Sequence, residues 1–203
     1  MTSRRIIALS GRRGSGKSTA ANVIAEVASR KGLDTVFVSF ADPLKDGLYA
    51  MFRDVDTKGR LEEALWDSSE YREQEISFGV TSFTARRALT TLGTEWGRKF
   101  LGENVWVDHA MQRARKFAQD AVVVITDARF ENELRTVREE GGQVWLIDRP
   151  ERDTWFRWFT RHRSERSFFW PHAAARHASA TIPNDRGLSD FKKIVENLAT
   201  ASL

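Results

Sequence analysis

The sequence predicts an α/β protein in which helices cover both faces of a parallel sheet. Apolar runs of strand length alternate along the chain with runs of helical periodicity, which is the pattern of that class. Residues 121–126 (Ala-Val-Val-Val-Ile-Thr) are apolar almost throughout, as expected for a central parallel strand. A helix-length connection joins the first two strands, at 4–9 and 35–40, and therefore favours a parallel, right-handed βαβ unit.

The other elements follow from the same periodicities. Gly32 and the pair Gly141-Gly142 are expected helix stops, and residues 53–83 are predicted to be an insertion of helical fragments and loop. The five predicted strands lie at 4–9, 35–40, 121–126, 143–147 and 180–182. The predicted helices lie at 17–30, 42–52, 84–100, 104–119, 131–140, 151–162 and 188–198.

The composition limits the kind of protein. The chain has 203 residues, 41% of them hydrophobic, which suits one globular domain with a full core. It has 0 cysteines, so neither disulfides nor cysteine metal sites are expected. No apolar stretch approaches the roughly 20 residues that span a bilayer. Residues 1–5 lead into the first strand without the apolar core of a signal peptide, so we expect a soluble, cytoplasmic protein.

The net charge of +4 does not identify a partner, because nucleic acids and small polyanions both suit a basic surface. More informative is the stretch 11–18, Gly-Arg-Arg-Gly-Ser-Gly-Lys-Ser, which matches G-x-x-x-x-G-K-S/T between a strand and a helix. Glycines let such a loop curl so that its amides point inward at phosphates, and the next helix adds its dipole. The alternative is a glycine-rich turn that merely precedes a helix.

This motif predicts a three-layer P-loop NTPase fold with a parallel five-stranded sheet, and a site for ATP. Lys17 is expected to reach the β- and γ-phosphates, and the Ser18 hydroxyl to bind Mg²⁺. Arg12 and Arg13 either add charge near the donor or lie in solvent. The predicted ATP-binding residues are Gly11, Arg13, Gly14, Ser15, Gly16, Lys17, Ser18 and Thr19.

Two further polar clusters follow predicted strands, at 42–45 and 127–129. Ligands of open parallel sheets bind beyond the carboxyl ends of the strands, so both clusters are candidates for the same site as the loop. In the common sheet order, the second strand would bring Asp42 beside the phosphate loop. Asp42 would then orient an acceptor or bind Mg²⁺ through water, and Lys45 would contact an acceptor phosphate. The alternatives are a helix cap ahead of Pro43 and a solvated lysine.

Asp127 ends the most apolar strand, where an acidic residue can face the Mg²⁺ shell. The alternative is a helix cap. Arg129 can pair with a phosphate through two hydrogen bonds, or form a salt bridge with Glu133 four residues later.

The segment 155–178 is rich in arginine and aromatic residues, and we expect a lid there. Arg161 and Arg163 are its candidates for neutralising charge on a transferred phosphoryl group, although a charge run is also typical of a solvated face. The histidines at 162, 172 and 177 do not form a convincing ligand set, so no zinc site is proposed.

Several segments together resemble the deoxynucleoside monophosphate kinases encoded by bacteriophages, which are similar to P-loop nucleoside monophosphate kinases. These segments are the loop at 11–18, Phe-Ala-Asp-Pro-Leu-Lys (40–45), Leu-Gly-Thr-Glu-Trp-Gly-Arg (92–98), Thr-Asp-Ala-Arg-Phe-Glu-Asn-Glu (126–133), His-Arg-Ser-Glu (162–165) and Ile-Pro-Asn-Asp (182–185).

The resemblance implies Mg²⁺-dependent transfer of the γ-phosphoryl group of ATP to a deoxynucleoside monophosphate. It implies a single kinase domain, 1–203, with a helical acceptor-binding region at about 43–102 and a lid at about 155–178. The implied acceptor-binding residues are Phe40, Asp42, Lys45, Arg86, Trp96, Arg98 and Arg129. The expected catalytic residues are Lys17, Asp42, Asp127, Arg129, Arg161 and Arg163, with Ser18 and Asp127 at the metal. Phe40 or Trp96 would stack on the base, unless these rings only pack in the core.

The expected partners are therefore ATP and a deoxynucleoside monophosphate, in the host cytoplasm if the chain is phage-encoded. We expect no stable binding to nucleic acid and none to membranes, and the sequence is compatible with a homodimer. A dephospho-coenzyme A or phosphomevalonate kinase is the nearest alternative, and a DNA-stimulated P-loop ATPase is a more distant one. The N-K-x-D sequence of a guanine-specific switch does not occur in the chain.

Overall fold

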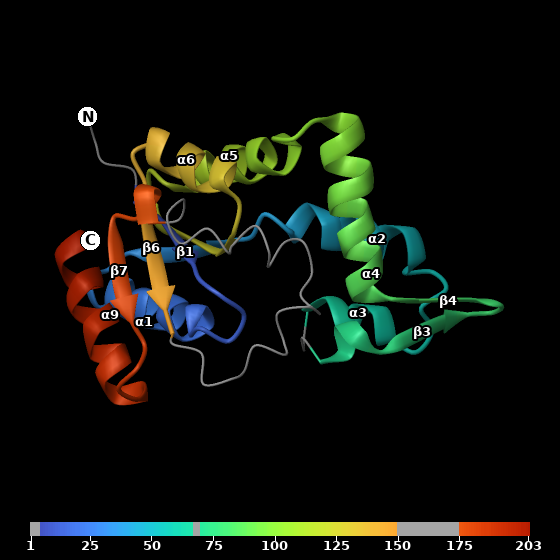
Figure 1. Ribbon diagram of the computed structural model, residues 1–203, viewed down its shortest axis with the longest axis horizontal. Helices are drawn as coiled ribbons and strands as arrows, with labels where there is room; N and C mark the ends of the chain where they lie inside the picture. Colours follow the sequence, from blue (N-terminus) through green and yellow to red (C-terminus); the bar gives the residue numbers. More distant parts are fainter. Residues whose placement is uncertain (1–4, 67–69, 150–174) are drawn as a thin grey trace. The chain divides into compact units, whose positions relative to one another are not determined.

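The computed structural model describes residues 5–66, 70–149 and 175–203 (Figure 1). The chain forms two compact units, one made of Met1–Ser39 and Ala110–Leu203 and the other of Phe40–His109. We call the first the phosphate-loop unit and the second the inserted unit, because the second interrupts the first in the sequence.

Five parallel strands form the sheet of the phosphate-loop unit, in the order β2-β5-β1-β6-β7, which confirms the predicted parallel five-stranded sheet. The central strand β1 is flanked on both edges, since Ile7 pairs with Val124 on one side and Gln143 on the other. All five residues of β1 are buried, which is why they are apolar almost without exception. The strands are β1 (Ile6–Ser10), β2 (Asp34–Val38), β5 (Ala121–Ala128), β6 (Gln143–Asp148) and β7 (Ala180–Pro183).

The strand order corrects one expectation. β5 lies between β1 and β2, so the strands adjacent to the one that leads into the phosphate loop are β5 and β6, and not β2. The connection through a helix requires parallel strands but leaves room for another strand between them. Burial explains the choice, because β5 is apolar enough for an interior position, whereas the edge strand β2 exposes Phe37 to 46%.

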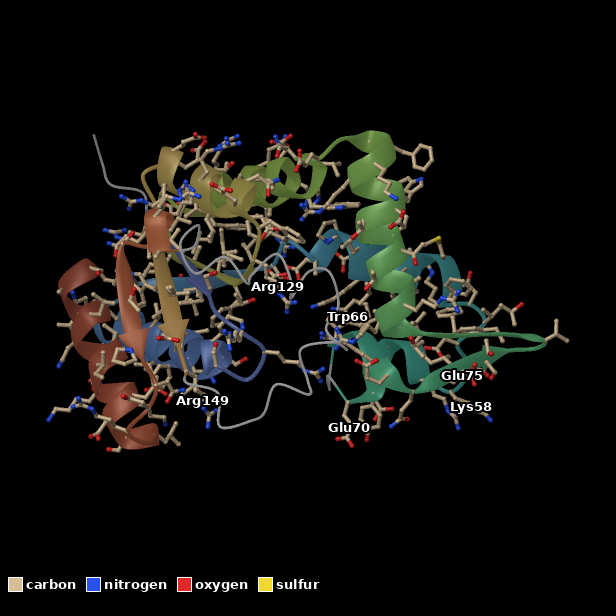
Figure 2. All side chains as sticks on the ribbon, in the orientation of Figure 1. Lys58, Trp66, Glu70, Glu75, Arg129 and Arg149 are labelled. Carbon is tan, nitrogen blue, oxygen red and sulfur yellow. The ribbon has the colours of Figure 1, made fainter. Side chains whose placement is uncertain are left out.

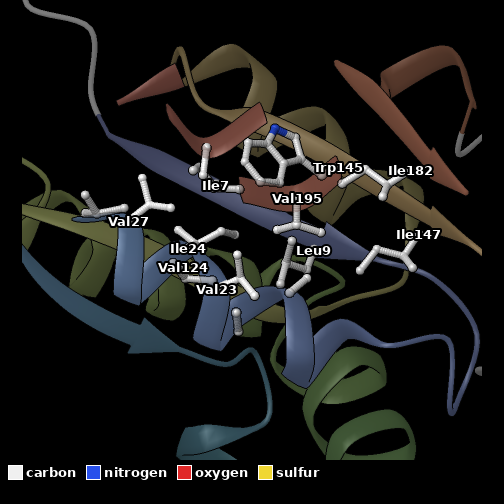
Figure 3. Close-up of a cluster of buried hydrophobic side chains, with 14 of the residues drawn as sticks. Ile7, Leu9, Val23, Ile24, Val27, Val124, Trp145, Ile147, Ile182 and Val195 are labelled. Atoms are coloured by element: carbon white, nitrogen blue, oxygen red, sulfur yellow. The ribbon is translucent and has the colours of Figure 1, made fainter. Parts of the chain in front are cut away.

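Two helices, α1 (Lys17–Arg30) and α9 (Leu188–Ser202), pack on one face of this sheet (Figure 3). They cover alternate residues of the strands, such as Ile7 and Leu9 of β1 and Trp145 of β6. Trp145 is fully buried, and its indole N–H donates to Gln143 Oε1 at 2.9 Å. Complete burial of one large apolar side chain stabilises the fold by about 1.5–3 kcal/mol. Because many such side chains are buried together on this face, it is the main core of the unit.

Helix α6 (Glu131–Glu139) and helix α5 (Val105–Phe117) lie together on the other side of the sheet (Figure 1). Leu134 and Val137 of α6 are buried, and so are Ala110 and Met111 of α5. The predicted three-layer arrangement is therefore present in this unit.

The inserted unit consists of short elements around a small apolar core. They are α2 (Asp42–Phe52), α3 (Arg60–Trp66), the 3-10 helix η1 (Tyr71–Glu73), the hairpin of β3 (Glu75–Phe78) and β4 (Thr81–Thr84), α4 (Ala85–Thr90), the π-helix η2 (Thr91–Leu101) and the first residues of α5. The core residues are Leu48, Leu61, Ala64, Leu65, Ile76 and Ala85.

The antiparallel hairpin was not predicted within 53–83. Its strands are only four residues long. β3 alternates polar and apolar residues (Glu75-Ile76-Ser77-Phe78), but over the shortest run that can indicate a strand, and β4 contains a single apolar residue, Phe83. It is held by aromatic packing, because the Phe52 ring lies 5.1 Å from both the Phe78 and the Phe83 ring.

The helix predicted at 84–100 is present, but it continues as a π-helix from Thr91 onwards. Gly93 and Gly97 are buried on its inner side. The indole of Trp106 lies against them and donates to Gly93 O at 2.9 Å. An added Cβ at Gly97 would collide with the Trp106 ring, so the close packing of this helix depends on the missing side chain.

Within the described ranges, none of the helices combines the length and apolar character that a membrane crossing requires. The helix predicted at 151–162 lies outside the described residues, as does the predicted lid up to residue 174.

Candidate active site

The phosphate loop connects β1 to α1 and contains backbone that only glycine adopts readily. Gly11 has φ +148° and Gly16 has φ +109°. A Cβ at Gly11 would also lie 2.6 Å from both Ile147 O and Ser15 Oγ, so the loop has no room for a larger residue there. These features explain the glycines of the motif at two of their positions.

The N-terminus of α1 is open to an anion. Gly16 is its N-cap and offers no side chain that could cap the first turn. The first turn contains no acidic residue. Because the first amides of a helix lack partners within the helix and carry the positive end of its dipole, this terminus suits a phosphate group.

Lys17 and Ser15 add polar groups to the loop itself. The Lys17 ammonium donates to Gly11 O at 2.7 Å and to Arg12 O at 2.8 Å, so its charge lies over the loop. The Ser15 hydroxyl is buried and has no hydrogen-bond partner among the described residues. A buried hydroxyl without a partner is costly, and a phosphate oxygen would satisfy it. The loop therefore fits a phosphate-bearing ligand.

Asp127 lies near the end of β5, the strand adjacent to β1. It is not a helix cap, because Phe130 is the N-cap of α6, so that alternative is wrong. The hydroxyl of Ser39 donates to Asp127 Oδ2 at 2.6 Å. Ser10, the last residue of β1, donates from its hydroxyl to Ala128 O at 3.0 Å. The start of the loop and the end of β5 are thus joined directly.

Ser18 and Asp127 are the predicted metal ligands. The described residues contain no group of three or more histidine, cysteine or acidic side chains that could hold a metal. Ser18 is exposed and Asp127 half-buried, and both offer oxygen. Mg²⁺ prefers oxygen ligands and keeps several waters, so a protein contribution this small suits it when a substrate supplies phosphate oxygens.

The Arg129 guanidinium, labelled in Figure 2, forms no hydrogen bond or ion pair with the part of the chain that the structure describes. The alternative salt bridge to Glu133 is therefore not present. Glu133 is only 2% exposed, and its Oε2 instead accepts from the backbone N–H of Arg129 at 2.6 Å and of Phe130 at 2.9 Å. The buried carboxylate thus fixes the backbone that carries Arg129.

The inserted unit holds most of the predicted acceptor-binding residues. Asp42 is the first residue of α2, and the N-cap is Ala41 and not Asp42 as the alternative proposed. Lys45 Nζ lies 3.8 Å from Asp42 Oδ1, and its side chain is only 16% exposed. Lys45 is therefore not the freely solvated lysine of the alternative reading.

The other predicted acceptor-binding residues of this unit differ in accessibility. Trp96 is 48% exposed and its ring is tilted against Trp106 at 6.4 Å, so one side is available for stacking. Phe40 is only 4% exposed, as core packing requires. Arg86 forms an ion pair with Glu73, and Arg98 is half-buried on the π-helix. Their roles in binding stay predictions.

Arg161 and Arg163, the predicted lid arginines, lie outside the described residues. Within the phosphate-loop unit, the structure does bring together the loop, Asp127 and the backbone of Arg129 at one edge of the sheet, since the parallel strands β1 and β5 end there.

Sequence reasoning missed three residues at this edge. Ser39 holds Asp127, Arg149 donates from Nη1 to Gly14 O at 2.9 Å, and Asn184 donates from Nδ2 to Ser15 O at 2.7 Å. Figure 2 labels Arg149, which follows β6. Their position in the sequence could have indicated them, because each of the three directly follows a parallel strand.

Comparison with known proteins adds one substantial match. No family model matches the chain. A protein of Acanthamoeba polyphaga mimivirus, provisionally named as a deoxynucleotide monophosphate kinase, is 32% identical over 157 residues, which cover 71% of this chain and 74% of that protein. The solved dephospho-CoA kinase from Campylobacter jejuni has a TM-score of 0.41 and 15% identity, covering 98% of this chain and 97% of its own. Shikimate kinase from Bacteroides thetaiotaomicron has a TM-score of 0.42 and 13% identity, covering 95% of each chain.

Proposed function

Because the chain belongs to the family of phosphate-loop kinases that includes this mimivirus protein, we propose that it transfers the γ-phosphoryl group of ATP to a deoxynucleoside 5′-monophosphate. The product is a deoxynucleoside diphosphate. The observation that carries the phosphotransferase part is the loop between β1 and α1, with Asp127 on the adjacent strand. The acceptor class is supported by the name of the viral protein and by the motifs outside the loop.

On the donor side, the amides of the loop and of the first turn of α1 bind the phosphates of ATP. Lys17 places an ammonium over the loop, and this charge stabilises negative charge on the β- and γ-phosphates as the bond between them breaks. The Ser15 hydroxyl supplies one further donor.

Ser18 would hold Mg²⁺ through its hydroxyl, and Asp127 would hold it through its carboxylate by way of water. The ion would supply charge neutralisation to the phosphates of ATP. Ser39 keeps the Asp127 side chain in one orientation through its hydrogen bond.

The acceptor needs no strong general base, because its attacking group is a phosphate oxygen that is already anionic at neutral pH. Binding, orientation and electrostatics therefore supply most of the rate enhancement. We propose that Asp42, Lys45, Arg86, Trp96 and Arg98 of the inserted unit bind the acceptor, and that Arg129 pairs with a reacting phosphate. Arg161 and Arg163 are proposed to neutralise the transferred group.

A coupled assay of ADP formation tests this function. The purified chain is given ATP, Mg²⁺ and one acceptor at a time: each common deoxynucleoside monophosphate, dephospho-coenzyme A, phosphomevalonate, and DNA alone. We expect turnover with at least one deoxynucleoside monophosphate. Turnover only with a non-nucleotide acceptor, or only DNA-stimulated hydrolysis, would contradict the proposal.

Lys17→Ala is the matched variant for this assay. It removes the charge from the loop, and we expect it to lower kcat by about 100-fold or more, as loss of one transition-state donor commonly does. Lys31→Ala is the control, because Lys31 lies at the other end of α1 and its ammonium donates to Thr200 O at 2.6 Å. Equal losses in both variants would argue against the assigned role of Lys17.

A further inference from the structure

The ends of two neighbouring strands hold consecutive carbonyl groups of the phosphate loop. Arg149 follows β6 and donates to Gly14 O at 2.9 Å, while Asn184 follows β7 and donates to Ser15 O at 2.7 Å. These donors come from far along the chain, since Asn184 and Ser15 are 169 residues apart. Neither contact is needed to form α1 or either strand.

Asn184 is itself held firmly. Its backbone N–H donates to Asp148 O at 2.8 Å, which continues the pairing of β6 with β7. Its side-chain amide lies close to Gly16, because a Cβ on Gly16 would be 2.8 Å from Asn184 Nδ2 and 3.1 Å from the Phe191 ring. Phe191 is 2% exposed and belongs to the main core. The amide is thus supported by the sheet and by α9.

The hydrogen bond to Ser15 O also fixes the direction of the N–H group in the same peptide unit. A peptide unit is planar and trans, so its C=O and N–H point in opposite directions. The unit that contains Ser15 O also contains the N–H of Gly16. Holding the carbonyl toward Asn184 therefore turns the Gly16 N–H away from Asn184. This N–H donates to no carbonyl among the described residues and is available to an anion.

We propose that Asn184 is a positioning residue for the donor site: it fixes the Gly14–Gly16 part of the loop so that the Gly16 amide stays directed at a triphosphate. This inference rests on the proposed function only in so far as ATP is the donor. It does not depend on which acceptor is used.

Binding of the triphosphate is the direct measurement, made by calorimetry on the full chain without any acceptor. The ligands are ATP and inorganic tripolyphosphate, each with Mg²⁺. In Asn184→Leu, which keeps the side-chain volume and loses the donor, we expect Kd to rise about tenfold for both ligands, the effect of one lost hydrogen bond and an unsatisfied carbonyl. In turnover assays KM for ATP should rise while KM for the acceptor does not change.

An exchange of neighbouring side chains supplies the matched control. Asp185 is exposed and its carboxylate lies 3.9 Å from Arg186, away from the loop contacts. The double variant Asn184→Asp, Asp185→Asn keeps composition, net charge and side-chain size, and exchanges the amide and the carboxylate between the two positions. We expect it to bind both ligands at least as weakly as Asn184→Leu, because it loses the donor and also places a negative charge beside the loop, whereas Asp185→Asn alone binds at least as tightly as the parent. The double variant also serves if Asn184→Leu does not fold.

The midpoint temperature of thermal unfolding, measured without ligand, shows whether a variant binds weakly because the loop is no longer held or because the fold is less stable. A positioning role predicts a midpoint within a few degrees of the parent in the double variant, with a smaller increase on adding ATP. Parent-like binding by the double variant would overturn the inference while leaving the proposed function intact. So would a loss of ATP binding without loss of tripolyphosphate binding. A parent chain that bound neither ligand would overturn both.

Discussion

The hydroxyl of Ser39 contacts the carboxylate on which the proposed magnesium site depends. Its hydrogen bond to Asp127 Oδ2 is 2.6 Å long and charge-assisted, so it restricts the carboxylate more than a neutral contact would. Residues that orient metal-binding side chains commonly contribute tenfold or more to metal affinity. The same reasoning applies to Glu133, whose buried carboxylate orders the backbone of Arg129.

For Ser39→Ala we expect the Mg²⁺ concentration for half-maximal activity to rise about tenfold, because Asp127 loses a hydrogen bond that orients its carboxylate. The measurement is a Mg²⁺ titration of initial rates at saturating ATP. Ser29→Ala is the control, since Ser29 is an exposed residue near the end of α1. An unchanged Mg²⁺ requirement in the Ser39 variant would remove the reason to connect this hydroxyl with the metal.

At the scale of elements, the π-helix is shaped by two glycines and one tryptophan. Gly97 brings the helix backbone against the Trp106 ring, Gly93 leaves room for Leu44, and the Trp106 indole N–H donates to Gly93 O. π-helical geometry is rare, and single-turn π-bulges in α-helices frequently occur at functional sites. Here the segment carries two predicted acceptor-binding residues, Trp96 and Arg98, so its geometry decides how they are presented.

Gly97→Ala should destabilise the chain by about 1–3 kcal/mol, because the new methyl group overlaps the Trp106 ring and the core must shift. Urea unfolding followed by tryptophan fluorescence measures it. Gly47→Ala is the opposite case, since Gly47 lies within α2 with no atom within 4 Å of the added Cβ. That variant should gain about 0.5–1 kcal/mol from helix propensity. If Gly97→Ala left the free energy of unfolding unchanged, the contact between Gly97 and Trp106 would not be as close as the structure indicates.

At the scale of the whole molecule, the two units allow the two substrates to be assigned separately. With ATP alone, we expect slower amide exchange in residues 10–20 and around Asn184 of the phosphate-loop unit. With an accepted deoxynucleoside monophosphate alone, we expect slower exchange within Phe40–His109, because bound ligand restricts local opening. Hydrogen exchange with mass spectrometry resolves these peptides. If the deoxynucleoside monophosphate slowed amide exchange only in the phosphate-loop unit, the assignment of the acceptor to the inserted unit would be contradicted.

Much of the phosphate-loop unit could be predicted from local sequence. Long apolar runs identified its strands, and the glycine motif identified the loop, because both signals need only neighbouring residues. The hairpin of the inserted unit could not be predicted, since its short exposed strands depend on packing against Phe52. The π geometry of η2 likewise depends on Trp106, which lies beyond the helix itself.

The sequence alone determined the class of fold, the phosphate loop and the acidic residue at the end of β5. Only the tertiary structure decided that β5 lies between β1 and β2, that Ser39 meets Asp127 across 88 residues, and that Asn184 holds Ser15 across 169. The physical reason is that apolar runs and a glycine motif are signals of neighbouring residues. The neighbours of a parallel strand, and the distant side chains that hold the loop, depend instead on how the whole chain packs.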